Sequence, residues 1–86
     1  MAFIKLMPGV SREDVSGVTV LVDEAGNAAV LNSTAGMILD LFLAGCSCDD
    51  AADVMCERFS VARDEALRDA LEVAAMLVDK ALVERC

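Results

Sequence analysis

The stretch AAVLNSTAGMILDLF, residues 28–42, decides the fold. Its first four residues are small or apolar, without Pro or charge, which is typical of a short strand. Asn32, Ser33 and Thr34 follow at once, and the side-chain oxygen of each can accept a hydrogen bond from an unpaired backbone N–H at a helix start. The stretch therefore predicts a strand that passes directly into a helix.

The predicted helix runs from Ala35 to Ala44 and is apolar except for Gly36 and Asp40. A helix that is apolar on nearly all sides is typical of a buried helix. We expect the side chain of Asp40 to face solvent. Gly45 follows in the position where glycine commonly ends a helix.

The segment before this stretch predicts strands. Val18 to Asp23 alternates valines with other residues, and Glu24 to Asn27 is a turn that joins it to the strand Ala28–Leu31. Val10 to Val15 is a candidate for a further paired strand. Met1 to Met7 is either a short first strand or an ordered arm, so the sequence predicts a small sheet of two or three strands.

The segment after the stretch predicts two more helices. Ser47 is a candidate N-cap for a helix that carries on one face Cys48, Ala52, Met55 and Phe59. Arg63 to Lys80 is the longest predicted helix, and Leu82 and Val83 either pack beneath it or form a short closing strand. The predicted fold is α+β and winged-helix-like, a single domain over residues 1–86 with a small N-terminal antiparallel sheet followed by three helices.

The net charge of −8 restricts the partners. Nucleic-acid binding depends on Lys and Arg that neutralise phosphates, and anionic membrane surfaces attract basic segments, so neither nucleic acid nor a membrane is an expected partner. No apolar run reaches the roughly 18 residues of a membrane helix, and the first residues lack a signal-peptide pattern. We therefore expect a cytoplasmic protein.

Few side chains are suited to catalysis. The chain has no His and no Tyr, so Ser and Cys nucleophiles lack the usual base. The cysteines lack the paired spacing of a zinc site, and we expect no metal, no cofactor and no enzymatic activity. Thiols in the cytosol stay reduced, and Cys48 and Cys56 are predicted to be small buried residues, whereas Cys46 and Cys86 have no assigned role.

Two features point to binding. Residues Ala28–Leu31 lack the Pro or charge that protects an edge strand, so they can accept a guest strand; alternatively, this strand is central and already paired on both sides. The longest helix carries an apolar arc of about 160° when its residues are spaced at the helical period, and part of the arc can line a groove unless all of it belongs to the core. The arc consists of two neighbouring stripes. One stripe contains Ala66, Ala70, Val73 and Leu77, and the other contains Leu67, Leu71, Ala74 and Val78.

The sequence resembles the PqqD family over roughly Val10 to Glu84. The resemblance rests on residues 30–36, VLNSTAG, and on the apolar residues of the helix that follows, Ile38, Leu39, Leu41 and Phe42. Gly45 with Ser47 matches the start of the family's second helix. The third helix and the closing segment match at Asp69, Leu77, Leu82 and Val83.

The resemblance implies a function. PqqD-like domains are recognition elements that bind the leader of a ribosomally made precursor peptide and deliver it to a modifying enzyme, often a radical-SAM protein, in pyrroloquinoline quinone biosynthesis or related peptide maturation. In the family, the leader adds as a strand to the third strand and packs against the third helix. Carried over to this chain, the resemblance implies a peptide-binding site with two parts. The edge strand is Ala28, Ala29, Val30 and Leu31, and the apolar wall of the groove is the stripe Leu67, Leu71, Ala74 and Val78. The other stripe of the longest helix is the alternative for this wall.

Two other functions remain open at this point. A winged-helix transcriptional regulator has a similar order of elements, but the acidic charge argues against DNA binding. A structural module is the second alternative, in which the strand at residues 28–31 pairs with a second copy to form a homodimer. Coordinates in which this strand has partners on both sides within one monomer would contradict the peptide-binding hypothesis.

Overall fold

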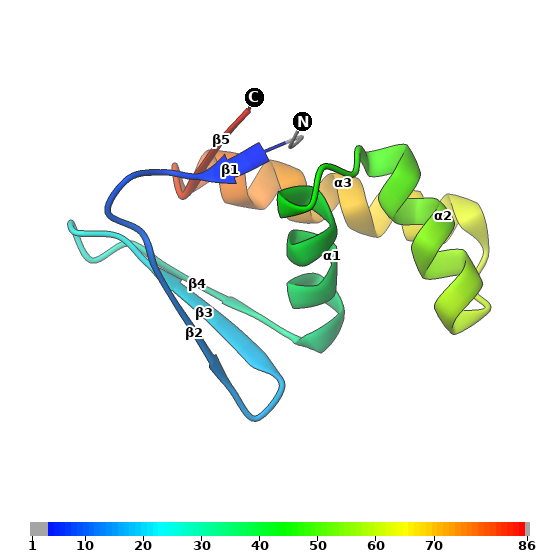
Figure 1. Cartoon of the computed structure of the whole chain (residues 1–86), viewed down its shortest axis with the longest axis horizontal. Helices are drawn as coiled ribbons and strands as arrows, with labels where there is room; N and C mark the ends of the chain where they lie inside the picture. Colours follow the sequence, from blue (N-terminus) through cyan, green and yellow to red (C-terminus); the bar gives the residue numbers. More distant parts are fainter. Residues whose placement is uncertain (1–3, 86) are drawn as a thin grey trace.

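The structure, a computed structural model, describes residues 4–85 and places a small sheet before three helices (Figure 1). The α+β class is therefore confirmed. Cys86 and the first three residues of the predicted segment Met1–Met7 lie outside the described residues. The strands are β1 (Ile4–Leu6), β2 (Ser11–Val15), β3 (Val18–Val22), β4 (Ala28–Leu31) and β5 (Val83–Arg85), and the helices are α1 (Ser33–Leu43), α2 (Cys48–Phe59) and α3 (Arg63–Asp79).

The strands form two separate antiparallel sheets. β2, β3 and β4 make a three-stranded sheet in that order, while β1 pairs with β5 at the other end of the chain. Of the two alternatives left open for Leu82 and Val83, the short closing strand is present from Val83, and Leu82 is buried as well. The partner of this strand is the segment predicted as a first strand or arm. The sequence predicted two or three strands rather than five because three-residue strands carry almost no periodicity of their own.

The helix starts follow the predicted capping chemistry. The side-chain oxygen of Asn32 accepts a hydrogen bond of 2.8 Å from the backbone N–H of Ala35, so Asn32 is the N-cap among the three candidates. Ser47 caps α2 through a reciprocal pair of hydrogen bonds with Asp50, 3.1 and 3.3 Å long. Each bond satisfies a backbone N–H that a helix start leaves unpaired.

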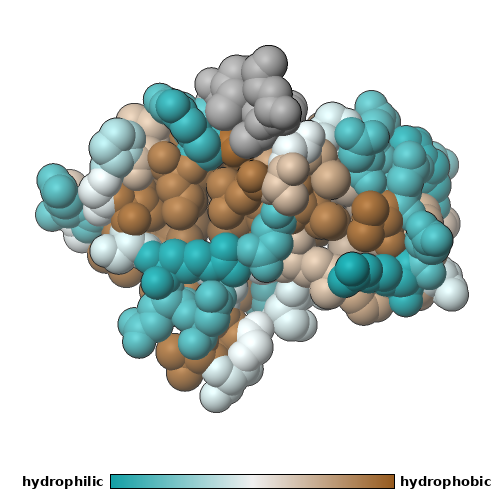
Figure 2. Space-filling view, in the orientation of Figure 1, coloured by the Kyte–Doolittle hydropathy of each residue, from teal (hydrophilic) through white to brown (hydrophobic). Residues whose placement is uncertain are grey.

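The core lies where α1 packs between the three-stranded sheet and α3. The apolar side of α1 is buried through Ile38, Leu39 and Phe42, as its sequence predicted. Apolar residues also reach the surface in the middle of the view in Figure 2, between more hydrophilic ends. The predicted buried face of α2 is confirmed for Ala52 and Met55, while Phe59, the last residue of the helix, is 48% exposed.

The two cysteines of α2, Cys48 and Cys56, are less buried than predicted. Cys46, Cys48 and Cys56 are all half-buried, and none of them forms a disulfide among the described residues. Cys48 lies in the first turn and Cys56 near the last turn of α2, where neighbouring elements cover a helix incompletely. Residues 4–85 also contain no helix with both the length and the apolar character needed to cross a bilayer.

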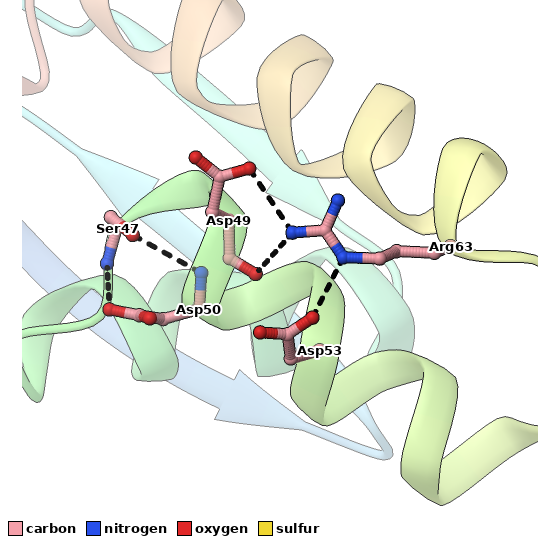
Figure 3. A network of polar contacts seen from close by, with 5 residues as sticks. All are labelled: Ser47, Asp49, Asp50, Asp53 and Arg63. Atoms are coloured by element: carbon pink, nitrogen blue, oxygen red, sulfur yellow. Dashed lines mark hydrogen bonds and ion pairs between the residues drawn. The ribbon is translucent and has the colours of Figure 1, made fainter.

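Polar contacts hold α2 against the start of α3 (Figure 3). The Nε of Arg63 lies 2.8 Å from Asp53 Oδ1, and another guanidinium nitrogen lies 3.2 Å from Asp49 Oδ1. The hydrogen bond to Asp53, followed by the one to Asp49, raises the pKa of Arg63. Because all three side chains are exposed, these ion pairs orient the helix start more than they stabilise the fold.

A second polar network connects the sheet to α1. Arg12 on β2 lies 2.6 Å from Asp40 Oδ1 and 3.2 Å from Asp14 Oδ2. The hydroxyl of Thr19 donates to Asp14 over 2.5 Å, and this bond is the main cause of the lowered pKa of Asp14. Asp40 is exposed, as the sequence predicted, and it also fixes α1 to β2.

Gly36 is a point of close approach between α1 and the sheet. A Cβ at this position would lie 2.8 Å from Thr19 Oγ1, and Thr19 is only 5% exposed. We expect Gly36→Ala to destabilise the protein by about 1 kcal/mol, because the overlap outweighs the helix-forming advantage of Ala over Gly. The free energy of unfolding in urea measures this change.

The effect of Gly36→Ala on the free energy of unfolding should change when the Thr19 hydroxyl is removed. In a Thr19→Ala background, Gly36→Ala should be neutral or stabilising, since the methyl group then enters vacated space. Equal destabilisation in both backgrounds would contradict the close approach of Gly36 to Thr19.

Candidate functional site

β4 lies at the edge of its sheet. It pairs with β3 on one side, and within the described residues it has no strand on the other side. The alternative that the strand is central is therefore wrong for residues 4–85. Ala28–Leu31 also carries no Pro, charge or bulge that would discourage a guest.

The hydrogen-bond register shows which backbone groups of β4 are unpaired. Asp23 N–H donates to Asn27 C=O over 2.9 Å, at the end of the turn that joins β3 to β4. In an antiparallel pair, hydrogen-bonded and non-hydrogen-bonded residue pairs alternate. The continuous register that follows makes Ala29 and Leu31 the residues that bond to β3.

The backbone groups of Ala28 and Val30 consequently point away from β3. Each presents one N–H and one C=O to the open side, which is the pattern that a guest strand needs for antiparallel or parallel pairing. The side chain of Val30 is 70% exposed on the face turned away from α1. Ala29 and Leu31 instead bury their side chains in the core, at 4% and 1% exposure.

A cleft of about 330 Å³ begins where β4 ends. We call it the α1–α3 cleft. Its sides come from the start of α1 and the middle of α3, and its acids are Asp69 and Glu72. The other residues that line it are the apolar Ala35, Ile38 and Val73 and the polar Asn32 and Thr34.

A second cleft, of about 400 Å³, continues along the helix, and we call it the α3 cleft. It shares Glu72 with the α1–α3 cleft and is lined mainly by apolar surface from Leu67 and Leu71. Asp64, Arg68 and Ala75 complete it. A peptide leaving the edge of β4 therefore has a continuous path over α3.

The two predicted stripes of α3 have different surroundings. The stripe given as the alternative wall is core, because all four of its residues are buried at 9% exposure or less. Of these, Val73 also borders the α1–α3 cleft, and Ala66 borders a separate pocket of about 240 Å³ next to Met55 and Phe59 of α2. In the other stripe, Leu67 is half-buried and Leu71 is 53% exposed, and both line the α3 cleft.

The remaining two residues of that stripe differ from Leu67 and Leu71. Ala74 lies in the core at 5% exposure, where the side of α3 turns toward its neighbours. Val78 is 40% exposed but lines neither cleft. The α1–α3 cleft begins at Asn32, directly after β4, and shares Glu72 with the α3 cleft that Leu67 and Leu71 line.

Sequence reasoning missed the residues that border the clefts with polar groups. Asn32 was identified as a helix cap, and it also marks the junction between the edge strand and the α1–α3 cleft. Asp69 and Glu72 lie on the longest predicted helix. Their spacing of three residues places them on one helix face, which is the signal that could have indicated an acidic border.

Comparison with known proteins gives one family and two solved structures. Residues 18–83 match the family described as Coenzyme PQQ synthesis protein D (PqqD). A comparison with curated protein sequences gives no match. The structure is similar to a lasso peptide synthetase B1 complexed with the leader peptide, with a TM-score of 0.88 and 28% identity over 96% of this chain and 99% of that chain. It is also similar to TbiB1 in complex with the TbiA(beta) leader peptide, with a TM-score of 0.81 and 25% identity over 93% of this chain and 94% of that chain.

Proposed function

The chain belongs to the PqqD family, and from this membership we propose that it binds the leader of a ribosomally made precursor peptide by strand addition and presents that peptide to a modifying enzyme. Two structures similar to it are complexes with leader peptides. The proposed setting is the cytoplasm, in pyrroloquinoline quinone biosynthesis or a related peptide-maturation pathway. The proposed role is non-catalytic, in keeping with a chain that has no His to act as a general base.

The observation that carries this proposal is the open edge of β4. Its two outward residues, Ala28 and Val30, offer two N–H donors and two C=O acceptors in a row. A guest strand that pairs with them extends the sheet from three strands to four. Main-chain hydrogen bonds of this kind supply affinity, while pockets for alternate side chains supply specificity.

The clefts determine the side chains that such a guest needs. Guest residues that point toward the inner side of the sheet enter the α1–α3 cleft, which presents the polar groups of Asp69 and Glu72 beside largely buried apolar residues. Residues further along the guest reach Leu67 and Leu71. Ordering a disordered leader costs conformational entropy, so we expect a dissociation constant of about 10⁻⁹–10⁻⁶ M.

Binding without chemistry can still accelerate modification. A leader held on this domain keeps the attached core peptide close to the enzyme, and the effective concentration reaches about the millimolar range for a short flexible linker. The clefts have an acidic border and the whole chain has a net charge of −8, so a DNA-binding role is disfavoured.

Amide hydrogen exchange tests the proposal at single residues. A synthetic peptide with the sequence of a candidate precursor leader is titrated in, and the exchange of the β4 amides is followed by NMR. We expect the amides of Ala28 and Val30 to exchange at least about tenfold more slowly when the peptide is bound, because they become hydrogen-bonded only then.

The neighbouring amides are the internal control. Ala29 and Leu31 already bond to β3, so their exchange should change much less. A peptide of the same composition in scrambled order should leave all four amides unchanged. Binding that protects other residues and leaves Ala28 and Val30 unprotected would contradict strand addition to β4.

A further inference from the structure

The three-stranded sheet exposes an apolar face on the side away from α1. The register places Val15, Val18, Val20, Val22 and Val30 on this side, and we call them the valine face. Val30 is 70% exposed and Val15 is 53% exposed. Figure 2 shows apolar atoms at the surface beside the tip of the β2–β3 hairpin, where the sheet projects from the helices.

The composition of this face differs from that of an ordinary solvent-facing sheet. An antiparallel sheet with one face on the core usually carries polar residues on the other. Here the cross-strand rows are Ser11 beside Val22, Glu13 beside Val20, and Val15 beside Val18, so valine predominates. Contiguous exposed apolar surface of this kind marks an interaction site in soluble domains.

The charges around the valine face are acidic. Glu13 lies within it, and Asp23 and Glu24 follow Val22 in the turn. Asp23 carries a charged carboxylate at neutral pH, and hydrogen bonds from Asn27 lower its pKa further. The nearest cation on these strands, Arg12, points to the opposite side of the sheet, where it pairs with Asp40.

These charges disfavour a second copy of the chain as the occupant. Two copies packed through their valine faces would bring the same acidic residues together, and each copy has a net charge of −8. Like charges facing each other across an interface oppose association. A partner with an apolar centre and a Lys- and Arg-rich rim has the complementary surface.

The valine face is continuous with the edge that receives the leader. Val30 belongs to both, since its backbone points to the open edge and its side chain to the valine face. In a guest strand paired with β4, the side chains beside Ala28 and Val30 stand on this same face. The bound leader thus widens the valine face by one strand.

We propose that the valine face is the docking surface for the enzyme that modifies the precursor peptide, and that this enzyme meets the domain through an apolar centre and a basic rim. This inference rests on the proposed function, because the bound leader supplies part of the surface. The enzyme would then bind the loaded domain more tightly than the empty one.

The test uses the double variant Val20→Thr/Val22→Thr. Threonine keeps the β-branched shape and strand propensity, so the sheet is retained while the face becomes polar. The probe is a purified enzyme that modifies the precursor carrying this leader, titrated against the domain with and without the leader peptide. We expect the enzyme's affinity for the loaded domain to fall at least about tenfold, with leader affinity unchanged.

The matched control is Val61→Thr, and the affinities for the enzyme and for the leader are measured separately. Val61→Thr makes the same chemical change at a 36% exposed residue between α2 and α3, away from this face, and should alter neither affinity. Unchanged enzyme binding in the double variant would overturn the docking surface and leave leader binding intact. Self-association of the wild type that disappears in the double variant would overturn it in favour of a second copy. Failure of the wild type to bind the leader would instead contradict the proposed function.

Discussion

Val30→Pro is expected to weaken leader binding at least about 30-fold, which corresponds to about 2 kcal/mol. Proline has no N–H, so a guest carbonyl would lose its partner and be left unsatisfied in the new interface, at a cost of about 1–3 kcal/mol. The N–H of Val30 makes no bond to β3, so its loss leaves the three-stranded sheet paired. Isothermal titration with the leader peptide measures the change.

The register provides the controls for this substitution. Val30→Thr keeps both the N–H and the strand propensity and should bind the leader nearly as well as the wild type. Ala29→Pro removes an N–H that bonds to β3, so it should lower the free energy of unfolding as well as the affinity. A folded Val30→Pro variant with wild-type affinity would show that the guest does not use this edge.

The elements near residues 28–42 could be predicted because their signals are local. A side-chain cap such as Asn32 acts on an N–H three residues away, and the burial of Ile38 and Phe42 follows from the apolar pattern of one helix. The turn and the strand Ala28–Leu31 were predicted from the same kind of short-range pattern.

The features that could not be predicted depend on contacts between distant segments. Pairing of β1 with β5 joins residues at opposite ends of the chain, and no local pattern specifies such a partner. The stripe of α3 that lines a cleft was also open, because both stripes are equally apolar in sequence. Packing against α1 and α2 resolved it by burying Ala66, Ala70 and Leu77.

The edge position of β4 could be predicted only in part from the sequence. The absence of Pro and charge in Ala28–Leu31 is visible in the sequence, but the same composition fits a central strand. Chain order made the difference, since α1 begins directly after Leu31 and leads away from the sheet. Ala29 and Leu31 were predicted as part of the peptide-binding site, and their contact with a guest stays a prediction. The register turns their backbone groups toward β3 and leaves the outward groups to Ala28 and Val30.

Leu71→Asp should also weaken leader binding by about 2 kcal/mol, or about 30-fold, without unfolding the domain. The Leu71 side chain is 53% exposed and lines the α3 cleft, so little core packing is lost. A guest that covers this position would lose apolar contact and would have to desolvate a carboxylate beside Glu72. Titration with the leader peptide gives the affinity, and a urea titration confirms the fold.

Val78→Asp is the matched control, because it makes a similar change on the same helix. Val78 is 40% exposed, yet it lines neither cleft, so a guest confined to the two clefts never reaches it. We expect its affinity for the leader to stay within about twofold of the wild type, since an exposed substitution away from a contact changes free energies by about 0.5 kcal/mol or less. Equal losses for the two variants would show that the guest runs along the whole predicted stripe. A loss for Val78→Asp alone would place the wall at the end of α3 and exclude the path from Glu72 to Leu71.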